Sequence, residues 1–193
     1  MLSYSTEARR CFDPVAAKHG LSCASADESE VLYEDAHAFL SVSFDNGGSY
    51  ELRVRCGLRA SPIESPSLSE IMTLENSPDA FQIDGMMSST APALATCLRR
   101  LGDLAMRYAP IAFGASDAWF QQLAELRRKE NWNYAVNSDL IVAKKKAGAA
   151  WERKDFAGVV AAFGPVRFYL SLSERKKLEY AIRKCTTSNG LQT

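Results

Sequence analysis

Two runs of alternating residues, separated by Asp45-Asn46-Gly47-Gly48, constrain the fold of this chain more than any other feature. Residues 39–44 alternate large apolar residues with serines, and residues 50–56 alternate apolar residues with Glu51, Arg53 and Arg55. A period of two is typical of a strand with one buried face. Asn46-Gly47 favours a type I′ turn, because both central residues of that turn need positive φ. The sequence therefore predicts an antiparallel hairpin whose polar face meets solvent or a partner.

The segment before this hairpin has the signals of a helix. Ser5 or Thr6 can cap a helix that runs to His19, and Gly20 stands where a helix usually stops. Pro14 lies inside this segment, so we expect a helix that is kinked or 3₁₀-like there. Alternatively, the residue before Pro14 is the N-cap and the helix is shorter.

The complete pattern predicts an α+β fold. Alternation over residues 21–58 indicates a three- to four-stranded antiparallel meander after the first helix. Residues 60–90 are rich in proline and serine and predict an irregular connection, apart from a short helix over 68–74 capped by Ser67. Apolar stripes then predict helices over 91–109, from 116 or 117, over 134–154 and over 155–168. A capping box, Ser171 to Glu174, begins the last helix.

The expected organisation has three parts. Residues 1–59 form the helix and sheet, residues 60–90 connect, and residues 91–193 form an all-helical half. We expect all three to pack as one body and the protein to be a monomer or a small homo-oligomer. No apolar run is long enough to cross a membrane, and the N-terminus is too polar for a secretory signal, so the expected location is the cytoplasm.

The chain carries no recognisable catalytic or metal-binding motif. It lacks a phosphate-binding glycine loop, a nucleophile elbow and an H-E-x-x-H zinc motif. The five cysteines are far apart and the two histidines have no ligand-type neighbours. We therefore expect reduced thiols, no metal, no cofactor and no enzymatic activity.

The zero formal net charge hides a split between the two halves of the sequence. Residues 1–98 carry 14 acidic and 6 basic side chains, and residues 99–193 carry 9 acidic and 17 basic ones. Complementary charge accelerates association between proteins, so the acidic half is expected to face a basic partner. The acidic candidates for this contact lie on or beside the meander: Asp27, Glu28, Glu30, Glu34, Asp35, Asp45 and Glu51. Basic clusters at 127–129, 144–146 and 175–177 lie in helical stretches without a nucleic-acid recognition motif, so nucleic acid is not the expected partner.

One segment resembles the helix-turn-helix middle of a tetratricopeptide repeat. It runs from Trp151 through Asp155-Phe156 and Val159 to Phe163. No second copy follows at 34-residue spacing, and an array needs about three repeats to bury its faces, so the resemblance implies a single hairpin. It implies a helical groove for a peptide or subunit lined by Trp151, Phe156, Phe163 and Tyr169. Alternatively, these aromatic side chains fill the core between helices.

The whole chain also resembles a group of uncharacterised bacterial proteins of about this length. The shared features include F-L-x-V-x-F-D (Phe39 to Asp45), the K-D-F turn (Lys154 to Phe156) and E-R-K-K-L-E-Y-A (Glu174 to Ala181). Such proteins look like the immunity or antitoxin partners of bacterial toxins. This resemblance implies a non-catalytic, protein-binding inhibitor of a toxin, and the alternative is a TPR-like adaptor that binds a peptide or subunit through its helical half.

Overall fold

The computed structural model describes residues 3–59, 65–83 and 86–189, with side chains up to residue 186. The chain divides into two compact units, which we call the sheet unit (residues 1–126) and the helical unit (residues 127–193). The boundary falls inside the long helix α5, Asp117–Glu152. Each unit has a hydrophobic core of its own.

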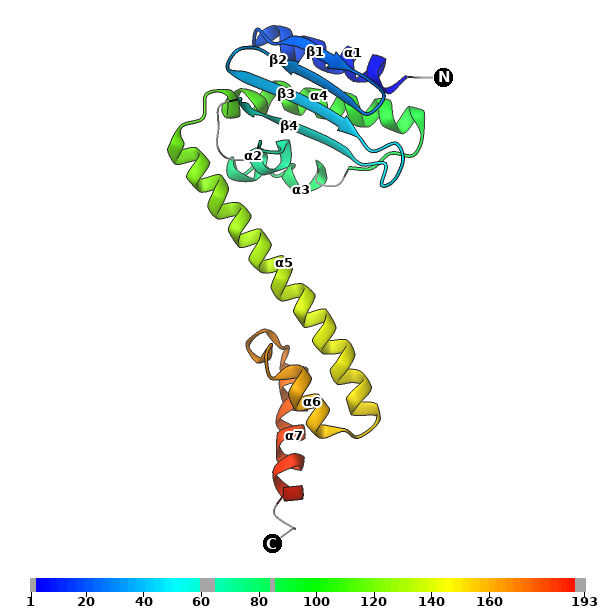
Figure 1. Ribbon diagram of the computed structural model, residues 1–193, viewed down its shortest axis with the longest axis vertical. Helices are drawn as coiled ribbons and strands as arrows, with labels where there is room; N and C mark the ends of the chain where they lie inside the picture. Colours follow the sequence, from blue (N-terminus) through cyan, green and yellow to red (C-terminus); the bar gives the residue numbers. More distant parts are fainter. Residues whose placement is uncertain (1–2, 60–64, 84–85, 190–193) are drawn as a thin grey trace. The chain divides into compact units, whose positions relative to one another are not determined.

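The sheet unit confirms the α+β fold class. A four-stranded antiparallel sheet follows the first helix, with its strands in sequence order (Figure 1). The elements are α1 (Tyr4–Lys18), β1 (Ser22–Ala26), β2 (Glu30–Glu34), β3 (Ala38–Phe44) and β4 (Leu52–Leu58). α1 continues through Pro14, and Gly20 follows it with a φ of 73°, so the longer of the two expected helices forms.

Helices cover one face of this sheet. α1 and α4 (Ala91–Phe113) lie side by side behind the strands, and α2 (Leu68–Leu74) and the short α3 (Ala80–Ile83) flank β4 (Figure 1). The capping box at Ser67 and Glu70 begins α2 at the expected residue. Alternate strand residues such as Tyr33 and Leu40 meet Phe12 of α1 and Leu98 of α4 in a core where each is almost completely buried.

The β3–β4 hairpin is confirmed, but the prediction of a type I′ turn at Asn46-Gly47 is wrong. The loop spans residues 45–51, and its positive φ falls at Tyr50, at 56°, rather than at Asn46 and Gly47. The Asp45 carboxylate accepts hydrogen bonds of 2.8 Å from the amide and the hydroxyl of Ser49. These bonds hold a wider loop than a two-residue turn, because an aspartate side chain competes locally with backbone pairing.

Helix boundaries in the second half differ from the expected ones. α4 continues past residue 109 to Phe113, and the two helices expected from 117 and from 134 are one helix, α5. No glycine or proline occurs between residues 115 and 147, so nothing in the chain stops α5. α6 (Phe156–Phe163) ends before Pro165, and a 3₁₀ turn, η1 (Arg167–Tyr169), completes the segment expected to be helical to 168.

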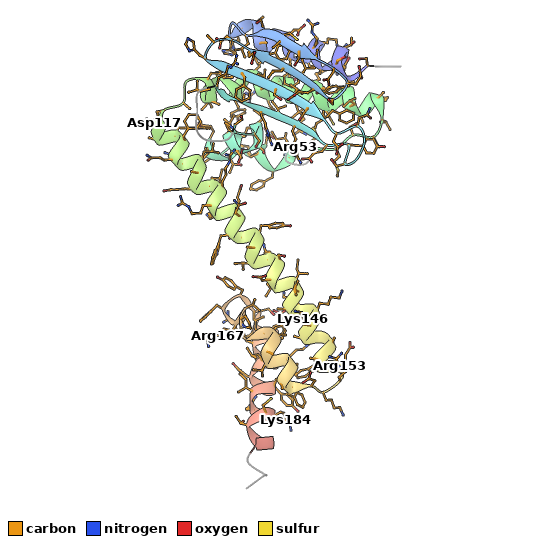
Figure 2. All side chains as sticks on the ribbon, in the orientation of Figure 1. Arg53, Asp117, Lys146, Arg153, Arg167 and Lys184 are labelled. Carbon is orange, nitrogen blue, oxygen red and sulfur yellow. The ribbon has the colours of Figure 1, made fainter. Side chains whose placement is uncertain are left out.

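The helical unit combines the C-terminal part of α5 with α6, η1 and α7 (Leu172–Asn189). Its core is made mostly of small residues: Ala143, Ala147, Ala150, Val159, Phe163, Val166, Leu170, Leu178 and Ala181. Charged side chains such as those of Lys146, Arg153 and Lys184 project outward from α5 and α7 (Figure 2). Among the described residues, no helix is both long and apolar enough to span a membrane.

Candidate functional site

A pocket of about 760 Å³ lies on the surface of the helical unit. We call it the aromatic–lysine pocket, because three aromatic rings and four lysines supply seven of its eight lining residues. These residues are Trp151, Glu152, Lys154, Phe156, Lys176, Lys177, Tyr180 and Lys184. Its volume lies within the range typical of ligand sites, about 300–1,000 Å³.

The turn between α5 and α6 brings the first two rings together. Lys154 has a φ of 59°, and the Asp155 amide donates to the carbonyl of Ala150 at 2.9 Å. The Asp155 carboxylate then accepts from the Gly158 amide at 2.8 Å and caps α6. Trp151 and Phe156 therefore stand on the two sides of a tight turn, with ring centroids 6.1 Å apart.

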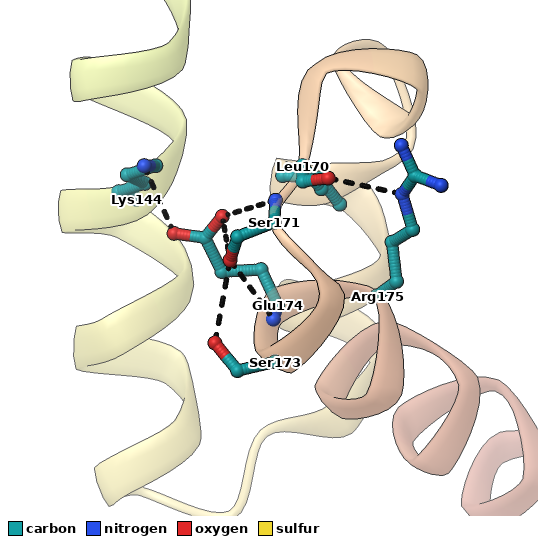
Figure 3. A network of polar contacts seen from close by, with 6 residues as sticks. All are labelled: Lys144, Leu170, Ser171, Ser173, Glu174 and Arg175. Carbon is teal, nitrogen blue, oxygen red and sulfur yellow. Dashed lines mark hydrogen bonds and ion pairs between the residues drawn. The ribbon is translucent and has the colours of Figure 1, made fainter.

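A polar network at the start of α7 fixes the helix that supplies the third ring (Figure 3). The Glu174 carboxylate accepts a 2.8 Å hydrogen bond from the Ser171 amide and forms a 3.0 Å ion pair with Lys144 of α5. The Ser171 hydroxyl, and then its amide and Lys144, lower the pKa of Glu174. This confirms the capping box and links α7 to α5, so the position of Tyr180 relative to Trp151 is set by packing and by this network.

The three rings form one cluster with cations at its edge. Tyr180 lies 5.6 Å from Trp151 and 5.7 Å from Phe156, between ring centroids, in tilted and edge-on arrangements. The Lys177 ammonium lies 5.6 Å from the Trp151 ring, and the Lys184 ammonium lies 5.5 Å from the Tyr180 ring. Both distances are within the range of cation–π attraction. The site thus offers an apolar wall and an excess of positive charge to the same ligand.

The sequence identified only part of this site. Of the four residues expected to line a helical groove, Trp151 and Phe156 line the pocket. Phe163 is 4% exposed and belongs to the core of the unit, and Tyr169 is 47% exposed in η1 and does not line the pocket. Tyr180 and the lysines of α7 were missed. Their spacing, with Lys177, Tyr180 and Lys184 on one face of a helix, is the signal that could have found them.

Three of the expected acidic contacts organise turns of the sheet unit. Asp27 accepts from the amides of Ser29 and Glu30 at 2.7 and 2.8 Å. Asp35 accepts from two amides of its own turn at 2.6 and 2.7 Å, and Asp45 holds the β3–β4 loop. The pKa of each carboxyl is lowered, for Asp27 first by the Ser29 hydroxyl and for the other two first by a backbone amide.

The other four acidic residues have partners as well. Glu28 accepts from the Tyr4 amide at 3.0 Å and so caps the start of α1. Glu30 accepts from the Ser41 hydroxyl at 2.5 Å. Glu34 and Glu51 form ion pairs of 3.1 and 2.7 Å with Arg59 and Arg53.

The meander separates these acids into groups. The turn after β1 and the loop after β3 lie at one end of the sheet, with Asp27, Glu28 and Asp45. The turn after β2 lies at the other end, with Glu34 and Asp35.

The described residues hold no group of three or more His, Cys, Asp or Glu side chains that could bind a metal ion. The five cysteines are unpaired thiols. Cys56 is completely buried in the sheet unit, and desolvation raises its pKa to about 12, so its thiolate is not available as a nucleophile near neutral pH.

The chain matches no protein-family model, no curated protein and no solved structure. The resemblance to immunity-type bacterial proteins therefore stays a hypothesis, and function has to be argued from the geometry of the two units.

Proposed function

We propose that this chain is a non-catalytic binding protein whose helical unit captures an acidic segment of a partner protein. The observation that carries the proposal is the aromatic–lysine pocket, in which Trp151, Phe156 and Tyr180 form one cluster and four lysines complete the lining. This corresponds to the adaptor hypothesis, with a pocket that differs in part from the groove that the sequence predicted.

The distribution of charge over the two units supports an acidic ligand. Residues 127–193 carry 14 basic and 6 acidic side chains, a net charge of +8, so the sheet unit carries −8. All the positive excess of the chain is therefore in the unit that holds the pocket. A field of this sign raises the association rate of acidic segments and is weakened by salt.

The rings define a second requirement for the ligand. An apolar or aromatic side chain that becomes buried against them contributes ~2 kcal/mol. Each exposed lysine–carboxylate pair adds only ~0–1 kcal/mol. An acidic peptide with a central apolar anchor therefore fits the pocket better than an acidic peptide without one.

A titration with synthetic peptides tests the proposal. The probe is a peptide with a central phenylalanine between glutamates, and the control peptide has alanine at the centre. We expect binding by the wild type to the first peptide, with a weaker response to the second. The double variant K176E/K177E should lose about tenfold or more in affinity, because two attractive pairs become repulsive. Lys129→Glu, on α5 and outside the pocket, is the matched control and should leave binding unchanged.

Two results would contradict the proposal. One is equal binding by the wild type and K176E/K177E. The other is tight binding of a single-stranded oligonucleotide with no binding of either peptide, which would make nucleic acid the ligand of the lysines and the stacked rings.

A second candidate function is inhibition of a basic bacterial toxin through the sheet unit. The net charge of −8 in that unit favours it, together with Asp27, Glu28 and Asp45 at one end of the sheet. Co-expression with the product of a neighbouring toxin gene provides the test. Protected cells and recovery of the toxin in a pull-down would support inhibition, and cells that die in spite of the protein would exclude it.

A further inference from the structure

A second hollow, of about 690 Å³, lies between α5 and α6 and shares no lining residue with the aromatic–lysine pocket. We call it the α5–α6 groove. Its α5 wall consists of residues in a pattern that repeats every seven positions, which places them on one helix face: Asp139, Val142, Ala143, Lys146, Ala149, Ala150 and Arg153. Its α6 wall includes Gly158, Ala161 and Ala162. The groove therefore follows the length of a helical hairpin.

The small residues of both walls allow another helix to approach closely. Alanine and glycine keep side-chain bulk away from the contact, so two helix axes can come to about 8 Å, the lower end of the usual range. Val142 is 48% exposed and Ala149 and Ala161 are exposed, so apolar surface in the groove is left uncovered within the helical unit. The groove can therefore accommodate a helix.

The charged residues on the α5 wall identify which helix would fit. Asp139 lies seven residues before Lys146, and Arg153 lies seven residues after it. Asp139 and Arg153 are therefore equally far from Lys146 along the helix. At 1.5 Å per residue, each lies about 10 Å from the middle along the axis. A copy of α5 that runs antiparallel and is centred on Lys146 places Asp139 opposite Arg153 at both ends. Lys146 and Arg153 both project from the C-terminal part of α5 (Figure 2).

We propose that the α5–α6 groove is the interface of a homodimer with twofold symmetry. In this dimer, α5 of a second copy lies antiparallel in the groove, and Asp139 of each subunit pairs with Arg153 of the partner subunit. A twofold interface is self-complementary by necessity, so each contact occurs twice. The two Lys146 side chains meet near the axis. Their long stems can cover the alanines while the ammonium groups stay in water, which limits the repulsion.

The other acidic residue that lines the groove, Asp155, caps α6, and its carboxylate accepts from the Gly158 amide at 2.8 Å. The pairing therefore depends on Asp139 and Arg153. This inference is independent of the proposed peptide binding, because the two hollows have no residue in common.

Charge reversal and its repair test the dimer. Sedimentation equilibrium of the full chain should show a concentration-dependent dimer for the wild type. D139R and R153D should each weaken dimerisation by about tenfold or more, because two attractive pairs become two repulsive ones. The double variant D139R/R153D restores opposite charges at both ends and should recover the wild-type dissociation constant. Lys145→Asp, a reversal on α5 outside the groove, should leave it unchanged.

The outcomes separate the two proposals. A wild type that stays monomeric at all protein concentrations overturns the dimer, and so does a double variant that is as monomeric as the single variants. Circular dichroism of each variant shows whether the helices remain intact. K176E/K177E should lose the acidic peptide and keep the dimer, while D139R should lose the dimer and keep the peptide.

Discussion

The two units use their residues for different purposes. The sheet unit has a core with large side chains such as Phe12, Tyr33, Ile71 and Leu98, whereas four of the nine buried residues in the smaller core of the helical unit are alanines. Nine of the twelve large exposed apolar residues among the described ones belong to the 67 residues of the helical unit. Most of the large exposed apolar side chains therefore lie in the helical unit, which supports the proposal that this unit binds a partner.

The charged residues differ in the same way. The seven acidic residues on or beside the meander hold turns, cap α1, pair with arginines or, for Glu30, accept from the Ser41 hydroxyl. In the helical unit, lysines line the aromatic–lysine pocket and stand over its rings. Net charge alone would make the two units equal candidates for binding. The local bonds of the acidic residues are made within the sheet unit, whereas four lysines of the helical unit line a pocket.

The strongest test of this contrast removes a large core side chain. Phe12→Ala deletes a ring that is 0% exposed and should destabilise the sheet unit by ~3–5 kcal/mol. Unfolding followed by two-dimensional NMR should then show that signals of residues 3–116 disappear at lower denaturant concentration, while those of α6 and α7 keep their wild-type midpoint. Phe81→Ala, at a ring that is 88% exposed, is the matched control and should change neither midpoint. A common shift of both sets of signals would show that the two units unfold as one.

A glycine in the sheet unit tests the close contact of its helices. A Cβ built on Gly102 of α4 would lie 2.9 Å from the backbone carbonyl oxygen of Cys11 in α1, and backbone cannot move aside cheaply. Gly102→Ala should therefore destabilise the sheet unit by ~1–3 kcal/mol in spite of alanine's better helix propensity. Urea denaturation provides the measurement, and a stabilised variant would show that α1 and α4 have room to separate.

A glycine in the helical unit should respond in the opposite direction. A Cβ on Gly148 of α5 meets nothing within 4 Å, and the residue lies inside a helix. Gly148→Ala should therefore stabilise the helical unit by ~0.5–1 kcal/mol, because alanine loses less backbone entropy in a helix. Urea denaturation, monitored through the NMR signals of α6 and α7, measures this gain in stability. A destabilised variant would mean that this position of α5 is covered.

Local interactions explain what the sequence predicted well. The hairpin, the N-cap at Ser67, the capping box at Ser171 and the stop at Gly20 each depend on residues within a few positions of one another. The continuous α5 was missed because the sequence around residues 127–133 changes from an amphipathic to a polar pattern without any residue that ends a helix. The prediction of a type I′ turn was wrong because hydrogen bonds to the side chain of Asp45 determine the conformation of the loop.

The candidate site shows the same limit. Trp151 and Phe156 are five residues apart, so a turn between helices places them together and the sequence could pair them. Tyr180 reaches the same cluster only through the packing of α7, and Phe163 points into the core because α6 buries that face. Residues brought together by tertiary packing carry no short-range signal.

The smallest expected effect is a change in the pH dependence of stability at low pH. Backbone amides lower the pKa of Asp35 in the folded protein, first that of Ala38 and then that of His37. A depressed folded-state pKa contributes stability above the unfolded value of ~4, and this contribution is lost as pH falls through the folded pKa. Asp35→Asn should therefore lower the melting temperature of the sheet unit near pH 6, and the difference from the wild type should shrink below pH ~4 and vanish in stronger acid.

Melting temperatures of the wild type and Asp35→Asn across this pH range test the sign. Acidic residues of the sheet unit with a lowered pKa include Asp27, Glu28, Asp35, Asp45 and Glu51. In the helical unit, Glu174 at the start of α7 also has a lowered pKa. Glu174→Gln should thus reproduce the pH dependence in signals of α7 and leave those of β2 and β3 unchanged. A difference for Asp35→Asn that grows in acid would mean that the turn after β2 is held by something other than the charged carboxylate.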